Sequence, residues 1–584
     1  MSRSCLGRGP SARAHAAALA LVATLLSGVA AAATPAAPVA PLTSADEVRL
    51  TWTEARRLAD STQYDSSLAV LRAALRQHGD NVDLRWLEAG VMGAAGRHRQ
   101  SVALYERLAA DHPEIARDLR ADLATQRLWA DDPAGAVRDF DLWLTAHPDD
   151  WDARQLRALA LSRSEHLGQA LATYDRLLRD RPGDTGLALE RARVLGWMGR
   201  HDDAIAAYGA ILKRHPDNAS ARLGRAMNEN WSGRHRRATK ELEQIVNGPH
   251  ADPEARKALA FARYWDGDPA GARRDLDIYV ARRDPEALEL SRRLDRELHS
   301  SLRLAYERAD DSDGLRVGTT SMALSWPLAP GTTGMLGWRR DNVRDAGGAW
   351  DPLQLTAGVT HFWNPAWSAH GYFTHIDWGD SGSTLPGGEL GATWRPLDRT
   401  RFDAGVSREP VITRRSLQLG ISVLSWAASA DLAASERLDF HVLGRKSYYS
   451  DDNSSERFAA SARLKACSER RGELFLSLGV ERLSTRVDLD DGYYDPASYV
   501  EWGPGVEAEW HPHKEWTLGL TSQVGWQREQ DSPTQPFYNL GGRAEVIVDD
   551  VWTLGLDGGL GNSNLTSSSG YERKWWQAAL TRSF

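Results

Sequence analysis

The sequence predicts a two-domain α+β protein. An N-terminal α-solenoid is expected over residues 46–298, followed by a C-terminal antiparallel transmembrane β-barrel of about 16 strands over residues 299–584. Three observations predict this architecture: a 34-residue helical repeat, a change to period-two alternation near residue 300, and a final strand that ends on an aromatic residue, Phe584. The first is typical of stacked helix pairs, and the other two are typical of outer-membrane barrels.

The N-terminus predicts export. Arg3, Arg8 and Arg13 precede an Ala-rich apolar stretch at 16–33, which ends in small residues, so residues 1–33 are interpreted as a signal peptide. A Pro/Ala linker follows at 34–45. Cleavage leaves Cys467 as the single cysteine, which excludes an intrachain disulfide. No later stretch reaches about 18 apolar residues, so we expect the chain to cross a membrane only as a barrel.

A proline or glycine recurs in the first half of the sequence at intervals of 33 to 36 residues: Gly79, Pro113, Pro148, Pro182, Pro216, Pro249 and Pro285. An amphipathic helix is predicted before each of these residues, with Tyr105, Tyr174 and Tyr208 at equivalent positions. This period and the terminal proline resemble the tetratricopeptide repeat, and about seven repeats fit residues 46–298. The histidines before the prolines recur with the repeat, so they are interpreted as turn residues and not metal ligands: His112, His147 and His215. We expect a docking surface, with no metal or other cofactor.

The second half of the sequence alternates between apolar and polar residues. Apolar residues take every second position in segments 474–480, 516–526 and 552–560, and 15 of the 23 tryptophans lie in residues 301–584. Segment lengths fit 14 to 18 membrane strands, with 16 the best value, and tryptophans at the strand ends suit an interfacial girdle. A soluble β-sandwich or propeller is the alternative. The terminal Phe584 favours the barrel, and it is expected to act as a signal to the barrel-assembly machinery.

The barrel half is acidic, with 28 Lys and Arg against 37 Asp and Glu in residues 301–584. A barrel of this size encloses an aqueous channel, so residues of the polar parity face the lumen. The acidic residues expected there, as candidates for contact with a polysaccharide, are Glu481, Glu501, Glu507, Glu509, Glu545, Asp549 and Asp557. They accompany Arg543 and predict a lumen that attracts cations. The competing interpretation is that acidic residues decorate solvent-exposed loops.

The combination of signal peptide, helical repeats and barrel resembles the export porins of bacterial exopolysaccharide systems. Two short segments resemble the cellulose export subunit: Ser407, Arg408 and Pro410 within 405–413, and Gly492, Tyr493, Tyr494 and Pro496 within 491–499. The cellulose subunit is expected to carry many more than seven repeats. The acidic lumen and the barrel size are closer to the poly-N-acetylglucosamine export porin, whose polymer is partly de-N-acetylated and therefore partly cationic.

The resemblance implies an outer-membrane porin with its repeat domain in the periplasm, which exports an exopolysaccharide for a biofilm matrix. Its expected partners are the polysaccharide chain, a periplasmic deacetylase or a protein of the synthase complex, outer-membrane lipid and the barrel-assembly machinery. Nucleic acid is not expected.

Other functions remain as alternatives. A cellulose export porin is the nearest, and a surface receptor, adhesin or protein-secretion pore is the next. An outer-membrane lipase or deacylase is disfavoured because the histidines of the barrel half stand in no recognisable nucleophile motif, so no enzymatic activity is expected: His361, His370, His375 and His441.

Overall fold

The computed structural model describes residues 44–248, 252–312, 314–378, 384–469, 471–489, 491–530, 532–564 and 572–584. The predicted signal peptide lies outside these residues, and so does the predicted linker except for its last two residues, which are already helical. The chain forms two compact units, one ending at Ala221 and the other running from Arg222 to Phe584.

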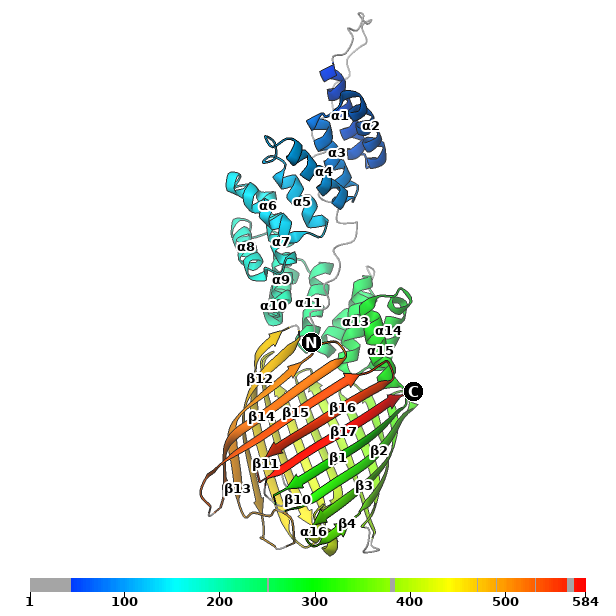
Figure 1. Ribbon diagram of the computed structural model, residues 1–584, viewed down its shortest axis with the longest axis vertical. Helices are drawn as coiled ribbons and strands as arrows, with labels where there is room; N and C mark the ends of the chain where they lie inside the picture. The colour runs from blue at the N-terminus through cyan, green and yellow to red at the C-terminus, as the bar shows by residue number, and fades with distance from the viewer. Residues whose placement is uncertain are drawn as a thin grey trace, which may run out of the picture. The chain divides into compact units, whose positions relative to one another are not determined.

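In the described residues from Ser44 to Leu298 the regular elements are all helices (Figure 1). Those of the first unit are α1 (Ser44–Asp60), α2 (Tyr64–His78), α3 (Val82–Ala94), α4 (His98–Asp111), α5 (Arg120–Trp129), α6 (Pro133–Ala146), α7 (Trp151–Arg163), α8 (Leu167–Asp180), α9 (Thr185–Trp197) and α10 (His201–Arg214). Helix α11 (Ala219–Trp231) begins at the division between the units, and the second unit continues with α12 (His235–Val246), α13 (Pro253–Asp266), α14 (Pro269–Ala281) and α15 (Pro285–Leu298).

The helices pair in a fixed pattern. In each pair the first helix buries an alanine at one equivalent position, and these alanines recur at the repeat spacing: Ala55, Ala89, Ala124, Ala158, Ala192, Ala226 and Ala260. The second helix buries a large residue at an equivalent position with the same spacing: Leu71, Tyr105, Phe140, Tyr174, Tyr208, Leu242 and Leu276. A small residue facing a large one lets two helices approach closely without leaving a void. The tyrosines singled out in the sequence are therefore core residues.

A residue with left-handed backbone conformation follows the first helix of each pair. These residues also recur about every 34 positions: Thr62, Gly96, Asp131, Glu165, Gly199, Gly233 and Gly267. The left-handed conformation ends a helix and reverses the chain, and glycine adopts it without a steric penalty. Each helix pair therefore depends on one backbone position as well as on its core.

We expect Gly199→Ala to lower the free energy of unfolding of the repeat region by about 1 kcal/mol. Gly199 has a φ of +72°, and an added Cβ would meet no atom within 4 Å, so the cost comes from the backbone conformation alone. Urea unfolding of the full-length protein in detergent, followed by the helical circular dichroism signal, measures it. Gly209→Ala is the matched control. It lies within α10, also has open space around its Cβ, and should stabilise by about 1 kcal/mol. Equal effects of the two changes would contradict the argument.

The C-terminal part is a closed antiparallel barrel. Among the described residues sixteen strands form its wall, and a short β4 (Gly348–Trp350) pairs with the last residues of β3. The wall strands are β1 (Ser301–Asp311), β2 (Arg316–Ala329), β3 (Thr332–Asp345), β5 (Leu353–Asn364), β6 (Trp367–Asp377), β7 (Thr384–Leu397), β8 (Thr400–Pro410), β9 (Ser422–Ala433), β10 (Leu438–Tyr449), β11 (Ser454–Glu469), β12 (Gly472–Thr485), β13 (Tyr499–Trp510), β14 (Trp516–Glu529), β15 (Gln535–Ile547), β16 (Trp552–Gly561) and β17 (Arg573–Ser583). One short helix, α16 (Arg414–Leu419), lies between β8 and β9. The predicted fold class and strand number are confirmed.

Strand β1 pairs with β17 over its whole length, from Ser301 opposite Ser583 to Asp311 opposite Arg573. Because the number of wall strands is even, the chain enters and leaves the barrel at the same end, as Figure 1 shows. We call the end at Ser301 and Ser583 the helix end and the opposite end the loop end. Closure leaves no unpaired edge, which is the condition for β-structure in a lipid bilayer.

None of the helices in the described part of the chain is long and apolar enough to cross a membrane.

Candidate functional site

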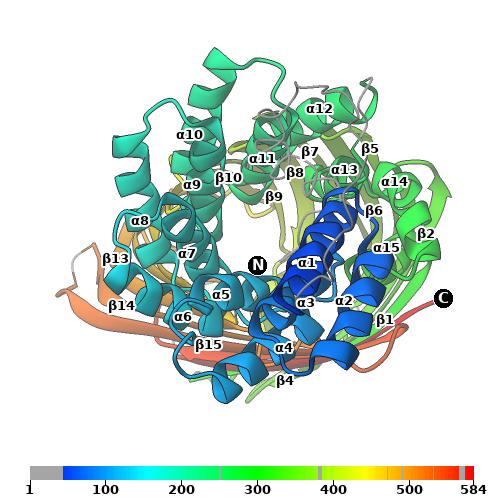
Figure 2. The same cartoon turned by 90° about the horizontal axis from the view of Figure 1, so that it is seen from above.

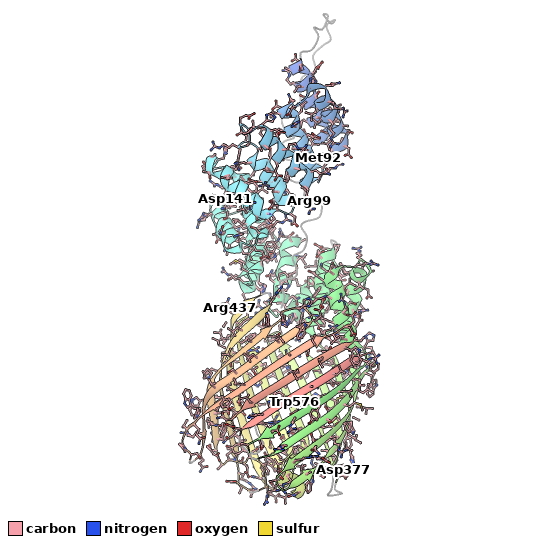
Figure 3. All side chains as sticks on the ribbon, in the orientation of Figure 1. Met92, Arg99, Asp141, Asp377, Arg437 and Trp576 are labelled. Atoms are coloured by element: carbon pink, nitrogen blue, oxygen red, sulfur yellow. The ribbon has the colours of Figure 1, made fainter. Side chains whose placement is uncertain are left out.

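The two faces of the barrel wall differ in chemistry. On β12, Leu474, Leu476, Leu478 and Val480 are exposed on the outer face, whereas the alternate residues, such as Glu481, point inward. The same division holds on β14, β16 and β17, and Trp576 marks the outer face of β17 in Figure 3. An apolar outside around a polar inside is the arrangement of a membrane barrel with an aqueous interior.

Predicted carboxylates meet on the inner face of β12 and β13. Glu481 is the register partner of Glu501, and Glu473, which was not among the predicted residues, is the partner of Glu509. Glu507 lies on the same face of β13, one inward position from Glu509. This side of the lumen therefore carries a row of carboxylates along two neighbouring strands.

Basic side chains of β11 accompany that row, and the sequence pattern missed them. Arg457 pairs with Glu481, Arg463 with Glu507 at 3.2 Å, and Lys465 with Glu473 at 3.1 Å. The Arg463 guanidinium also lies over the ring of Phe475, 4.4 Å from its centre. The wall is thus a row of ion pairs in place of a purely acidic surface.

Glu501 differs from the other carboxylates because it is only 5% exposed. It accepts hydrogen bonds from the Tyr499 hydroxyl, at 2.9 Å, and from the Ser563 hydroxyl. Its carboxylate holds the segment after β16 against β13. The parity of the sequence could not reveal this burial, and Glu501 is a structural residue here and not an exposed lumen contact.

The remaining predicted acids lie on or beside β15 and β16. Glu545 and Asp557 take inward positions, and Arg543 lies opposite Asp557 and 3.6 Å from Glu509. Asp549 does not belong to this set. It follows the end of β15, and its carboxylate accepts the backbone N–H groups of Val551 and Trp552, so it shapes a turn at the helix end. The predicted inward position of Asp549 was wrong because alternation does not mark where a strand ends.

The two segments that carry the family-like motifs come together at the loop end. Ser407, Arg408 and Pro410 end β8 and lead to Thr413, whose hydroxyl caps α16. The Ser416 hydroxyl of α16 donates to the Asp491 carbonyl oxygen at 2.7 Å. Gly492 follows with a φ of +85°, and a Cβ there would lie 2.6 Å from the Arg415 side chain. Ser416 and Asp491 lie 75 residues apart in sequence, and alternation within a strand does not relate them, so only the fold reveals this contact.

The rest of the second motif is held by side-chain contacts. Tyr493 stacks on Tyr449 at 4.4 Å and donates to Asp451 at 2.7 Å. Tyr494 donates to Glu529 at 3.1 Å, and the Pro496 carbonyl oxygen accepts the N–H of Thr485. This segment is therefore folded onto the loop ends of β10, β12 and β14.

Helix α16 lies across the barrel's loop end. Leu417 is buried against Val343 and Leu315, and Arg414 donates to Asp345 at the end of β3 at 2.6 Å. On its other side, α16 meets Asp491, which follows β12. In the ring of wall strands β3 and β12 stand half the circumference apart. Helix α16 and the segment after β12 that contains Asp491 therefore together reach across the opening.

Acid pH should stabilise the packing of the second motif segment. Asp495 lies outside the strands, and burial among Asp488, Asp451 and Asp491 raises its pKa to about 6, although it accepts the N–H of Leu489. An acid whose pKa is raised by folding disfavours the folded arrangement as it ionises, so the packing weakens as the pH rises from about 4 through 6.

Hydrogen exchange of residues 486–498, corrected for intrinsic rates, should show more protection at pH 5 than at pH 7.5. Asp495→Asn should lose most of this difference. An unchanged pH dependence in Asp495→Asn would assign the effect to other groups.

Helix α12 is fixed to the barrel through its first turn. The Asp398 carboxylate, in the turn between β7 and β8, accepts the backbone N–H groups of Arg236 at 2.7 Å and Arg237 at 3.3 Å. Arg399 donates to the Ser232 carbonyl oxygen at 2.9 Å. A carboxylate at a helix N-terminus satisfies unpaired donors and complements the helix dipole. Helices α12 to α15 follow one arc of the barrel rim in Figure 2.

We expect Asp398→Ala to weaken this junction by about 1–2 kcal/mol, because the first N–H groups of α12 lose their acceptor. Faster hydrogen exchange of the α12 amides in the full-length protein should report the loss. Asp550→Ala is the control. It changes a similar turn, but Asp550 is largely exposed and lies 4.0 Å from Arg292, at the outer limit of an ion pair, so the change should cost below about 0.5 kcal/mol. Equal exchange in both variants would refute the capping role.

Phe584 closes the chain at the helix end. Its backbone N–H donates to the Ser300 carbonyl oxygen at 2.9 Å, and its side chain is 58% exposed. Cys467 faces outward and is exposed. In the described residues no cluster of histidine, cysteine, aspartate or glutamate has the arrangement of a metal site.

Comparison with known proteins agrees with the helical part of this description. Residues 198–261 match the family model of the tetratricopeptide repeat. A search of curated protein sequences gave no match.

Three solved structures are similar in part. "Bacterial polysaccharide outer membrane secretin" is 16% identical, with a TM-score of 0.43, over 49% of this chain and 99% of that chain. A tetratricopeptide repeat protein from Parabacteroides merdae is 15% identical, with a TM-score of 0.38, over 42% and 98%. MamA from Desulfovibrio magneticus is 16% identical, with a TM-score of 0.25, over 30% and 96%. The family match at 198–261 and the closed antiparallel barrel together show a chain that joins tetratricopeptide repeats to a barrel.

Proposed function

We propose that this protein is an outer-membrane porin that exports a partly cationic exopolysaccharide. The best candidate is partly de-N-acetylated poly-β-1,6-N-acetyl-D-glucosamine, destined for a biofilm matrix. The protein would conduct the polymer without changing its bonds. The observation that carries the proposal is the row of inward carboxylates on β12 and β13, of which Glu473, Glu481 and Glu507 each pair with a cation on β11.

Ion pairs of this kind suit transport because they exchange partners easily. The Arg463–Glu507 pair is part-exposed, with about 40% of each side chain accessible. Such pairs contribute about 0–1 kcal/mol to stability, so a protonated glucosamine can replace the arginine at little cost in free energy. Phe475 between the charged residues offers an apolar face for a sugar ring. Several weak sites in succession allow movement, whereas one tight site would hold the chain.

The repeats would lie in the periplasm and dock a partner there, such as a deacetylase or a protein of the synthase complex. Support comes from the barrel's topology, since α15 leads into β1 at the end of the barrel where Phe584 lies. A C-terminal aromatic read by the barrel-assembly machinery would place that end on the periplasmic side. Tetratricopeptide repeats commonly present extended surfaces to protein partners.

Planar bilayers containing the full-length protein test the proposal. Three probes of equal length are compared: glucosamine oligomers, their N-acetylated forms and cello-oligomers. We expect the cationic oligomers to block the current most strongly, and the block to weaken as salt rises. Glu507→Gln with Glu509→Gln should reduce the block, whereas Glu456→Gln, on the outer face, should not. Block by cello-oligomers alone would favour cellulose export, and the absence of any channel would overturn the export function.

A further inference from the structure

The outer face of the barrel is basic at the loop end. Every basic residue in this set shares the outward parity of an exposed apolar neighbour, as Lys446 does with Tyr448 and Arg482 does with Val480. The set comprises Arg308, Arg316, Arg340, Arg344, Arg408, Lys446, Arg482, Arg528 and Lys574. They come from strands all around the wall, so the loop end carries a belt of positive charge.

The helix end of the same face is different. There the outward positions hold aromatic residues, among them Trp367, Trp394 and Phe402, whose rings stack at 5.4 to 5.6 Å. Arg582 is the basic residue that β17 places there, and it lies over Trp552 at 5.4 Å. A neutral aromatic girdle suits a zwitterionic headgroup layer, whereas a belt of cations suits an anionic one.

A groove of about 1290 Å³ crosses the outer face from β7 to β12. Its floor is a row of small residues that are register partners on successive strands: Ala392, Ala404, Ala428 and Gly444. Leu390, Trp426 and Phe458 form its apolar sides. The groove has the volume and the apolar lining to hold acyl chains.

Two cations of the belt border this groove. Lys446 is the register partner of Trp426, and Arg482 is the partner of Phe458. Lys446 contacts Glu456 at 2.9 Å, and no described carboxylate lies within ion-pair distance of Arg482. An apolar groove that ends at two cations complements a lipid with several acyl chains and phosphate on its headgroup.

We propose that this groove binds the phosphorylated, multiply acylated glycolipid of the outer leaflet, with Lys446 and Arg482 contacting its phosphates. The proposal requires the barrel to sit in an outer membrane with its loop end outward, and it does not depend on what the channel conducts. The belt of cations gives the same orientation around the rest of the wall. The glycolipid is favoured over a phospholipid because the basic residues of the belt outnumber the carboxylates that share its face, such as Asp310 and Glu456, and because a groove of about 1290 Å³ accommodates more than one chain.

The test uses the delipidated full-length protein in detergent, with binding measured by native mass spectrometry. The probes are diphosphorylated lipid A, the same lipid A without phosphates, phosphatidylethanolamine and inorganic phosphate as competitor. We expect diphosphorylated lipid A to bind best. Because each cation strengthens binding roughly fivefold, Lys446→Gln with Arg482→Gln should weaken binding about twenty-five-fold.

Arg582→Gln, at the helix end of the same face, is the charge-matched control and should leave binding unchanged. Ala404→Leu with Ala428→Leu fills the groove without altering charge and should also weaken binding. Retention of the heat-modifiable gel mobility shows that each variant is folded. Equal binding of lipid A with and without phosphates, or full competition by inorganic phosphate, would overturn the proposal.

Discussion

Replacing residues 412–420 by Asn-Gly is expected to raise the single-channel conductance of the full-length protein several-fold. The residues removed contain α16, which is anchored to Asp345 on one side of the opening and to Asp491 on the other. Barrels of 16 strands leave an aqueous channel unless a segment fills it. The substitution is compatible with the fold because the Val411 N–H already donates to the Ile421 carbonyl oxygen at 3.1 Å, and a two-residue turn can join such a pair.

Two point variants separate a blocking role from a general loss of stability. Leu417 is 1% exposed and Leu419 is 55% exposed, although both lie on α16. Leu417→Ala should loosen the helix and produce frequent open events, whereas Leu419→Ala should behave as the parent. A deletion variant with parental conductance would show that the constriction lies elsewhere in the lumen.

The sequence was sufficient to predict the fold class because both of its periods are local. A 34-residue spacing of Tyr105, Tyr174 and Tyr208 requires no knowledge of distant contacts, and neither does the alternation on β12. The inward parity of Glu481, Glu507 and Glu509 follows in the same way. A period-two pattern predicts on which face of the sheet a residue lies, but not which residues it contacts.

Which side chains meet in the site depends on the register of neighbouring strands and on contacts between segments far apart in sequence. An alternating sequence pattern contains neither kind of information. Arg457 reaches Glu481 only because β11 and β12 pair in one particular register. Arg414 reaches Asp345 from 69 residues away, and Ser416 reaches Asp491 from 75. The mistaken placement of Asp549 has the same origin, since the end of β15 is set by its pairing with β14 and β16.

The pairing of β13 with β14 depends on two glycines that allow unusually close backbones. A Cβ at Gly503 would lie 2.0 Å from the Val524 carbonyl oxygen, and one at Gly525 would lie 2.1 Å from that of Trp502. The neighbouring Pro504 has no N–H to donate, so the register is continuous only on either side of this point. A side chain at Gly503 must therefore push two strands apart.

Gly503→Ala is thus expected to destabilise the barrel by about 3 kcal/mol or more, because backbone atoms have no alternative rotamer through which to relieve the overlap. Heat-modifiable gel mobility after extraction from membranes measures the folded fraction, and the urea midpoint measures stability. Gly555→Ala is the matched control: it lies inward on β16, and its Cβ would meet nothing within 4 Å. It should be neutral or slightly stabilising, since alanine restricts the unfolded chain more than glycine does. If Gly503→Ala folded as well as Gly555→Ala, the two strands would have to separate more easily than their backbone contact implies.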